Sequence, residues 1–402
     1  MATWLVPPSD LTTEQIRAIE LPTDENKVIM GGPGSGKTIV LLYRAQHLAH
    51  EGNVPPERFR VFVFTNVLST YIRSAMEVLG IPETCVSTFD DWCKRYYEAH
   101  VSRRLPWDKI AKHPDFSAIR VGVFNHYGRS GQVNHLFDFV LVDEAQDLDR
   151  KCFDLLTRIA GHVTVCMDHN QQIYDGRSDE GEILSALGLR RRQVAFLETF
   201  RCCPYITQMA SLFIPDEKQR AAYLQQTKTA QTDIETPLLY RAAGFNDERQ
   251  MLIEMVKLRV QKGDRVAVLL PLKKQVFGFA KGMREAGVDV ETQDSLDFGS
   301  DTPKVITYHS AKGLTFDAVL LPRLTPSSFS AFSPERIERL LFVALTRATR
   351  WVYLSTDGRL PQLQRLETLV KEKRLTVKTP ASPSTKLPAP SKDNMEDLLD
   401  AL

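Results

Sequence analysis

Gly31-Gly32-Pro33-Gly34-Ser35-Gly36-Lys37-Thr38 decides the fold of this 402-residue chain. The stretch fits the pattern G-x-x-x-x-G-K-[ST], follows a strand-like apolar run at 27–30 and precedes an apolar helical stretch. Its glycines let backbone N–H groups turn toward phosphate oxygens, and the helix that follows adds positive potential. We therefore predict a site for ATP, in which Lys37 neutralises phosphate charge and Thr38 binds a magnesium ion.

A second motif is an apolar run at 139–142 that leads directly into Asp143-Glu144-Ala145-Gln146-Asp147. Buried parallel strands place such carboxylates at the carboxyl edge of a sheet, where ligands bind. We expect Asp143 to bind the magnesium ion. Glu144 is the candidate general base for an attacking water, because a metal-bound carboxylate is a poor base. The alternative for Glu144 is a solvated helix cap.

Short apolar, β-branched runs recur through both halves of the chain and are separated by helical stretches. They lie at 27–30, 60–64, 139–142, 163–167, 237–240, 265–270, 304–308, 318–321 and 351–354. This alternation predicts an α/β fold of two tandem domains, each a parallel sheet flanked by helices. The first domain is expected at 1–203 and the second at 204–372.

The segment 373–402 differs in composition from the rest of the chain. Pro, Ser, Thr, Lys and Ala dominate it through Ser391, so it is predicted to be a disordered C-terminal linker. Met395, Leu398, Leu399 and Leu402 then follow at helical spacing on an acidic background. That pattern suits a short amphipathic helix that docks on a protein partner, and a frayed end without function is the equal alternative.

The bulk composition is that of an ordinary soluble protein. Hydrophobic residues make up 43% of the chain, charged residues 25%, and no apolar run reaches membrane-spanning length. The start carries no secretory pattern and the six cysteines show no metal or disulfide spacing, which predicts a cytoplasmic setting. A net charge of +1 neither supports nor excludes a nucleic-acid partner.

The two motifs together resemble those of the UvrD/Rep/PcrA-type helicases of superfamily 1. Further stretches resemble that family's other motifs, in the family's order, from Leu11 to Ala348. The resemblance implies two RecA-like domains that hydrolyse ATP with Mg²⁺ and move on single-stranded DNA in the 3′ to 5′ direction.

The resemblance also assigns ATP contacts beyond the P-loop in the first domain. Gln15, in Leu11-Thr12-Thr13-Glu14-Gln15, is at the position that reads the adenine edge. Gln171 is at the position that senses the γ-phosphate. In the stretch 197–201, Phe200 would stack on adenine and Arg201 would reach the γ-phosphate.

Two residues of the second domain complete the implied ATP site. Gly313 belongs to Thr307-Tyr308-His309-Ser310-Ala311-Lys312-Gly313-Leu314, which resembles the family's motif V. Arg347 lies in the stretch 339–348, at the position of the arginine finger, a residue that stabilises transferring phosphoryl charge. The DNA contacts that the resemblance implies are Phe64, Thr65, Asn66, Thr88, Phe89, Tyr174, Arg177, Thr307 and His309.

The chain departs from the family pattern at several places. Thr315 stands where the family has a glutamate that contacts ribose, and Gly176 stands where it often has a base-stacking tryptophan. The family's two helical insertions are also short here, so we predict a reduced helical insertion at 89–136 and none in the second domain. Basic and aromatic residues alternate between 92 and 107, which suits either nucleic acid or a solvated amphipathic helix.

Three functions remain open from the sequence. The leading one is an ATP-dependent translocase and helicase on single-stranded DNA. The second is a regulatory DNA-dependent ATPase subunit of a repair or phage-defence complex with little unwinding of its own. The third, an NTPase or kinase that does not bind nucleic acid, requires that the expected DNA contacts fail to line a groove.

Overall fold

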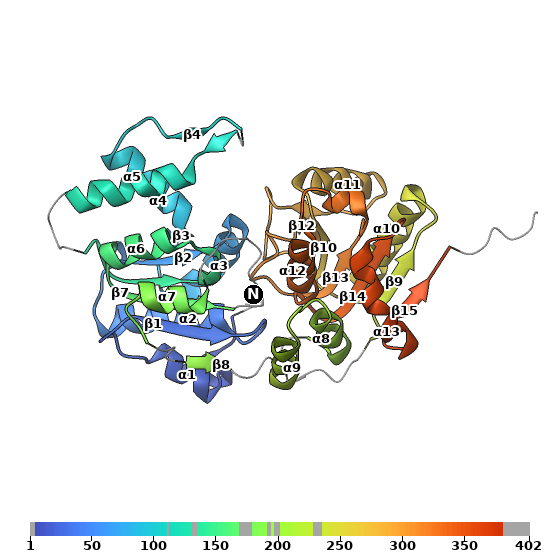
Figure 1. The fold of residues 1–402 in the computed structure, drawn as a ribbon, viewed down its shortest axis with the longest axis horizontal. Helices are drawn as coiled ribbons and strands as arrows, with labels where there is room; N and C mark the ends of the chain where they lie inside the picture. Colours follow the sequence, from blue (N-terminus) through green and yellow to red (C-terminus); the bar gives the residue numbers. More distant parts are fainter. Residues whose placement is uncertain are drawn as a thin grey trace, which may run out of the picture.

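Two sheets of parallel strands form the framework of the computed structural model (Figure 1). The first lies in the amino-terminal part of the chain and the second in the carboxy-terminal part, side by side. The structure describes residues 5–110, 112–129, 135–168, 179–190, 194–196, 202–227 and 235–380. The predicted α/β class with two sheets flanked by helices is confirmed.

The first sheet has the strand order β3-β2-β6-β7-β1-β8, and all its neighbours pair in parallel. Its strands are β1 (Lys27–Gly31), β2 (Phe59–Val63), β3 (Val86–Thr88), β6 (Phe137–Val142), β7 (Ala160–Met167) and β8 (Val194–Phe196). Its helices are α1 (Thr13–Ile19), α2 (Lys37–Glu51), α3 (Asn66–Leu79), α4 (Phe89–His100), α5 (Phe116–Arg129), α6 (Arg150–Ile159) and α7 (Glu180–Ala186).

Alternate side chains of these strands enter two separate apolar cores. Ile29 and Leu141 belong to the core that includes α2 and α3, whereas Val28 and Val140 belong to the core that includes α4 and α6. Both faces of the sheet are therefore covered, which explains why its strands are apolar along their whole length rather than alternating with polar residues.

The second sheet has the strand order β11-β12-β10-β13-β14-β9-β15 and is also parallel. Its strands are β9 (Leu238–Arg241), β10 (Val266–Leu270), β11 (Glu291–Thr292), β12 (Lys304–Thr307), β13 (Phe316–Leu321), β14 (Ala348–Thr356) and β15 (Thr376–Lys378). Its helices are α8 (Pro204–Ser211), α9 (Glu217–Gln226), α10 (Phe245–Gln261), α11 (Lys273–Glu285), α12 (Pro334–Leu345) and α13 (Glu367–Lys371).

A helical hairpin lies between β3 and β6, where the sequence predicts a reduced insertion. It consists of α4, the two-residue antiparallel strands β4 (Trp107–Asp108) and β5 (His113–Pro114), and α5. The hairpin rises above the first sheet in Figure 1. Trp92 at its base is buried against Phe62 and Phe89, so this aromatic residue anchors the hairpin to the sheet.

The expected linker at 373–402 is wrong for its first residues. Thr376–Lys378 form β15, which pairs in parallel with β9 at the edge of the second sheet. Leu375, just before it, is 2% exposed and joins the apolar core. A three-residue strand is too short to produce a recognisable periodicity, and only the neighbouring edge of β9 stabilises it. Residues 381–402, including Met395–Leu402, lie outside the described residues.

The two halves of the molecule share an apolar core. One cluster of buried side chains continues from α2 and α3 of the first half into α8 and α12 of the second. At its centre Gly313 lies against Leu68, and the ring of Tyr71 meets that of Phe298 at 4.9 Å. Among the described residues, none of the helices has the length and apolar character needed to cross a lipid bilayer.

Removing residues 373–402 should destabilise the second sheet, whereas removing only 381–402 should not. The longer deletion takes away Leu375 and β15, and the loss of a buried leucine side chain costs about 3 kcal/mol. The comparison of the two truncations in chemical denaturation measures this difference in the free energy of unfolding. Equal stability of both truncated chains would show that β15 does not contribute to the fold.

Candidate active site

The turn between β1 and α2 is built for close approach to an anion. Gly36 has the left-handed φ of +84°, and a Cβ added there would lie 2.4 Å from Nε2 of Gln15. Only glycine fits both requirements. The first turn of α2 follows at once, so its free backbone N–H groups and its positive dipole end point toward the turn. This is the geometry that the glycine-rich stretch at 31–38 predicts.

Lys37 is buried at the start of α2 and its ammonium folds over the turn. Its Nζ donates to the carbonyl oxygens of Gly31, at 2.7 Å, and Gly32, at 3.0 Å. The carboxylate of Asp168, at the end of β7, lies 4.0 Å from the same nitrogen. The ammonium is therefore held at the mouth of the turn, within reach of any phosphate that the turn binds.

Thr38 and Asp143 join the two motifs. The Thr38 hydroxyl donates to Oδ2 of Asp143 at 2.6 Å, which ties the start of α2 to the end of β6. Burial, and the neighbouring charge of Glu144, raise the pKa of Asp143 to about 6. A hydroxyl and a buried carboxylate side by side are the hard oxygen ligands that Mg²⁺ prefers. The two residues thus fit the predicted magnesium site.

Glu144 is the carboxylate kept ionised. Burial works to raise its pKa, but the charges of Lys312, Lys37 and Arg347 outweigh burial and lower the pKa to about 2. Its backbone is in the left-handed region, with φ of 53°, which is uncommon for a residue other than glycine. Such backbone strain is often found where a side chain is held for function, and here the Glu144 carboxylate is held between Gln146 and Lys312.

Gln146 holds Glu144 in place. Its Nε2 donates to Oε2 of Glu144 at 2.6 Å, and its Oε1 accepts from the backbone N–H of Asp168 at 3.0 Å. The side chain of Gln146 therefore links the end of β6 to the end of β7. This role of Gln146 could not be predicted from the sequence, because the sequence does not show which strand end the amide side chain will reach.

Two cations from the second half of the molecule face these carboxylates. Lys312 pairs with Asp147 and lies 3.3 Å from Oε2 of Glu144. Arg347, 1% exposed, donates through Nε to the carbonyl of Val343 at 2.9 Å, and its charge reaches Glu144. The predicted arginine finger is therefore buried, and its positive charge helps to lower the pKa of the predicted general base. Lys312 lies within the stretch that resembles motif V, but no separate prediction for its side chain follows from the sequence.

Gln15 is engaged by the protein at both ends of its amide. Its Oε1 accepts from the N–H of Thr12 at 2.9 Å as part of a capping box at the start of α1. Its Nε2 donates to the carbonyl of Ser35 at 3.0 Å, inside the glycine-rich turn. The structure places Gln15 next to the turn, and its reading of adenine stays a prediction.

Three threonines predicted to contact DNA lie at carboxyl ends of strands. Thr65 and Thr88 are the N-caps of α3 and α4, where their hydroxyls accept from Leu68 and Asp91. Thr307 ends β12, and its hydroxyl donates to that of Ser310 at 2.9 Å. The structure gives each threonine a local structural role and leaves its DNA contact a prediction.

The remaining DNA positions differ in accessibility. Phe64 and Asn66 flank Thr65, and the Phe64 ring lies 5.2 Å from the ammonium of Lys312. His309 is partly buried, and burial together with the charges of Arg336 and Lys312 lowers its pKa to about 4, so it is neutral at pH 7.

Phe89 is buried, and its predicted DNA contact stays a prediction. Its side chain is 4% exposed and packs in the core against Phe62, with ring centroids 5.2 Å apart. The first residue of a helix that follows a buried strand faces the same core, which the motif alone does not reveal. Five other predicted residues lie outside the described part of the chain: Gln171, Tyr174, Arg177, Phe200 and Arg201.

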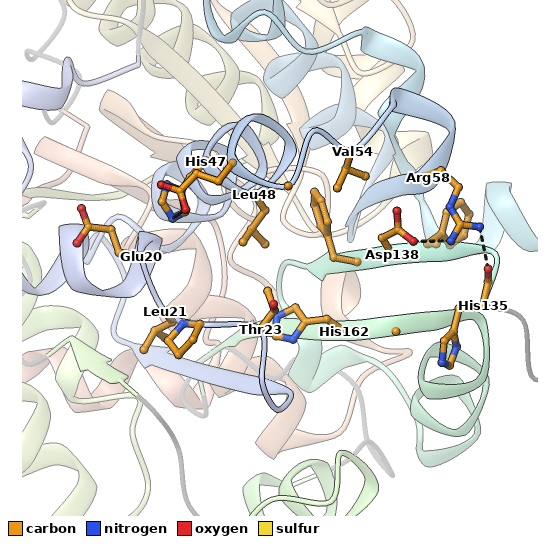
Figure 2. A pocket seen from close by; sticks show the side chains of 16 residues that line it. Glu20, Leu21, Thr23, His47, Leu48, Val54, Arg58, His135, Asp138 and His162 are labelled. Carbon is orange, nitrogen blue, oxygen red and sulfur yellow. Dashed lines mark hydrogen bonds and ion pairs between the residues drawn. The ribbon is translucent and has the colours of Figure 1, made fainter.

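Figure 2 shows a pocket of about 980 Å³ that is not this site. It lies at the amino ends of β6 and β7, and its lining includes His47, Asp138 and His162. Parallel sheets bind ligands beyond the carboxyl ends of their strands, so this pocket is at the wrong edge for a nucleotide. Its Asp138 is paired with Arg58, which also lines the pocket (Figure 2).

Comparison with known proteins identifies two domain families along the chain. Residues 15–177 match an AAA domain, and residues 304–355 match a UvrD-like helicase C-terminal domain. The first match contains the glycine-rich turn with Asp143 and Glu144, and the second contains Lys312 and Arg347. The charged residues of the candidate site therefore come from both matched domains.

Individual relatives are distant. A probable DNA helicase of Mycoplasma pneumoniae is 23% identical over 86% of this chain and 83% of its own length. The ATP-dependent DNA helicase PcrA of Bacillus subtilis is 32% identical over 24% of this chain and 13% of its own length. A solved C-terminal domain of a possible DNA helicase from Lactobacillus plantarum is 19% identical, covers 44% of this chain and 98% of that domain, and has a TM-score of 0.35. The chain covers 45% and 53% of two further relatives.

Replacement of Lys37 by alanine should weaken nucleotide binding by roughly 10- to 100-fold. The reason is the loss of charge-assisted hydrogen bonds to phosphate, each of about 1.5–3 kcal/mol. Titration with a fluorescent ATP analogue measures the effect. Lys109→Ala, at an exposed lysine of the helical hairpin, is the matched control and should bind like the unaltered chain. Unchanged affinity in Lys37→Ala would remove the glycine-rich turn from the nucleotide site.

Replacement of Glu144 by glutamine should preserve nucleotide binding and reduce turnover by about 10²- to 10⁴-fold, as expected for loss of a general base. Steady-state phosphate release, measured at saturating ATP, reports the change in kcat. Glu77→Gln, at an exposed glutamate of α3, is the control. Normal hydrolysis by Glu144→Gln would assign the base to another residue.

Proposed function

Because the chain belongs to the UvrD-like helicases of superfamily 1, we propose that it is an ATP-dependent motor that moves on single-stranded DNA. The observation that carries the proposal is the ion pair of Glu144 with Lys312, 3.3 Å apart, which joins a residue of the first domain to one of the second. Catalytic carboxylates from one domain and cations from the other make hydrolysis depend on the relative position of the domains. That dependence is what a motor requires.

Each residue of the site has a distinct role in hydrolysis. Lys37 exchanges its two loop carbonyls for oxygens of the β- and γ-phosphates. Glu144, ionised, orients the attacking water and accepts its proton. Arg347 stabilises the charge that develops on the transferring phosphoryl group. Thr38 and Asp143 would hold a magnesium ion, which would supply positive charge to neutralise the phosphates.

The proposed DNA path follows the strand ends that carry Thr65, Thr88, Thr307 and His309. Thr65 and Thr88 follow neighbouring strands of the first sheet, and Thr307 and His309 follow β12 of the second. Single-stranded DNA held by the residues of both domains would be pulled when the domains close and released when they open. The 3′ to 5′ direction is proposed from the resemblance to the family.

A regulatory ATPase subunit is the second candidate, and the helical hairpin favours it. Trp107 is 58% exposed and Ile110 is 95% exposed, both at the tip of the hairpin beside β4. Large apolar side chains at a projecting tip are typical of a protein interface. In this case the ATPase cycle would report DNA occupancy to a partner, in repair or in defence against phage, rather than separate a duplex.

Single-stranded DNA should stimulate ATP hydrolysis, most strongly at low salt. Contacts to phosphates release counterions, so the apparent DNA affinity should fall steeply as salt rises. The measurement is the ATPase rate against oligo-dT concentration at several salt concentrations, with Glu144→Gln as the background. Absence of stimulation at low salt would contradict the motor. Stimulation without unwinding of a tailed duplex would favour the regulatory subunit.

A further inference from the structure

Lys312 is a buried lysine without an assigned role in the proposed hydrolysis of ATP. It follows β12 in a tight turn, in which the N–H of Ala311 donates to the carbonyl of Thr307 and that of Lys312 to the carbonyl of His309. The side chain has no exposure to solvent. A fully buried ammonium is costly unless it is paired and hydrogen-bonded, so its partners determine what it does.

Both carboxylates that pair with Lys312 belong to the other domain. Its Nζ donates to Oδ2 of Asp147 and lies 3.3 Å from Oε2 of Glu144. Asp147 is as deeply buried as Lys312. The two acids lie on one turn, since Ala145–Asp147 form a single 3₁₀ turn after β6. One lysine of the second domain thus neutralises two buried carboxylates of the first.

The turn that carries Lys312 is pressed against the first domain. Gly313 has φ of +82°, and a Cβ added there would lie 2.8 Å from Cδ2 of Leu68 on α3. A side chain at position 313 would be strained by this φ and would require the Leu68 side chain to shift. The turn that carries Lys312 is therefore in close contact with α3 of the first domain.

We propose that Lys312 is a positioning residue that holds the carboxylate of Glu144 in its working orientation only when the two domains are closed. Gln146 fixes one side of that carboxylate from within the first domain. Lys312 fixes it from the second. Separation of the domains would remove this countercharge and open both carboxylates to solvent, so Glu144 would turn toward water. This inference rests on the proposed role of Glu144 in ATP hydrolysis.

The central test replaces Lys312 by methionine, which has a similar length and no charge. We expect kcat for ATP to fall by roughly 10²-fold, the effect of misplacing a catalytic group by about 1 Å. The affinity for a fluorescent ATP analogue and the KM for ATP should stay near those of the unaltered chain, which also shows that the variant is folded. Lys273→Met removes an exposed lysine of the same domain, paired with Asp294, and should leave kcat unchanged.

Two further variants test whether charge is responsible. Lys312→Arg keeps the positive charge and should retain more turnover than Lys312→Met. Asp147→Asn removes the charge that pairs with the Lys312 ammonium, so this variant should lower kcat by itself. In the double variant it should add little to the effect of Lys312→Met, because both substitutions act through one interaction. Equal losses in Lys312→Arg and Lys312→Met, or fully additive losses with Asp147→Asn, would overturn the proposed electrostatic role.

The outcome also separates this inference from the proposed function. All rates are measured without DNA and at saturating oligo-dT. If the unaltered chain hydrolyses ATP without DNA stimulation, the motor fails and the role of Lys312 is still decided by kcat. A normal kcat in Lys312→Met, or a loss of nucleotide binding equal to the loss of turnover, overturns the positioning role alone. If the unaltered chain hydrolyses no ATP, both are wrong.

Discussion

The hydrogen bond between the Thr38 hydroxyl and the Asp143 carboxylate, 2.6 Å long, is the contact on which the rest of the site depends. It fixes the first turn of α2 against the carboxyl end of β6. The glycine-rich turn, Lys37 and the paired acids are thereby set in one place. The parallel sheet makes this contact possible, because it brings the ends of β1, β6 and β7 to the same edge.

Charge burial then decides how the two domains cooperate. Glu144 and Asp147 are nearly inaccessible to water in the first domain, and their countercharges come from the second. Separation of the domains would break the ion pair with Lys312 and expose both carboxylates to water. In the proposed motor, the ion pair therefore links the position of Glu144 to domain closure.

Much of the fold could be predicted from periodicity and motif spacing. Apolar runs in the sequence predicted the positions of the central strands of both sheets, because strands covered on both faces are apolar throughout. Periodicity failed where an element is short or shaped by its neighbours. β15 exists only beside the edge of β9, and Phe89 is buried because α4 begins on the core side of β3. Neither fact is contained in the local sequence.

The sequence by itself determined the chemistry of the site. The residues at 31–38 and Asp143 predict phosphate and metal binding, and Glu144 predicts a general base, because backbone N–H groups and carboxylates act through their own local geometry. Only the tertiary structure decided which charges face one another. The partners of Lys312 lie 165 and 168 positions away in the chain, and the amide of Gln146 reaches the end of a different strand. Such pairings arise from the packing of the two halves through a shared apolar core, a property of the whole fold rather than of any segment.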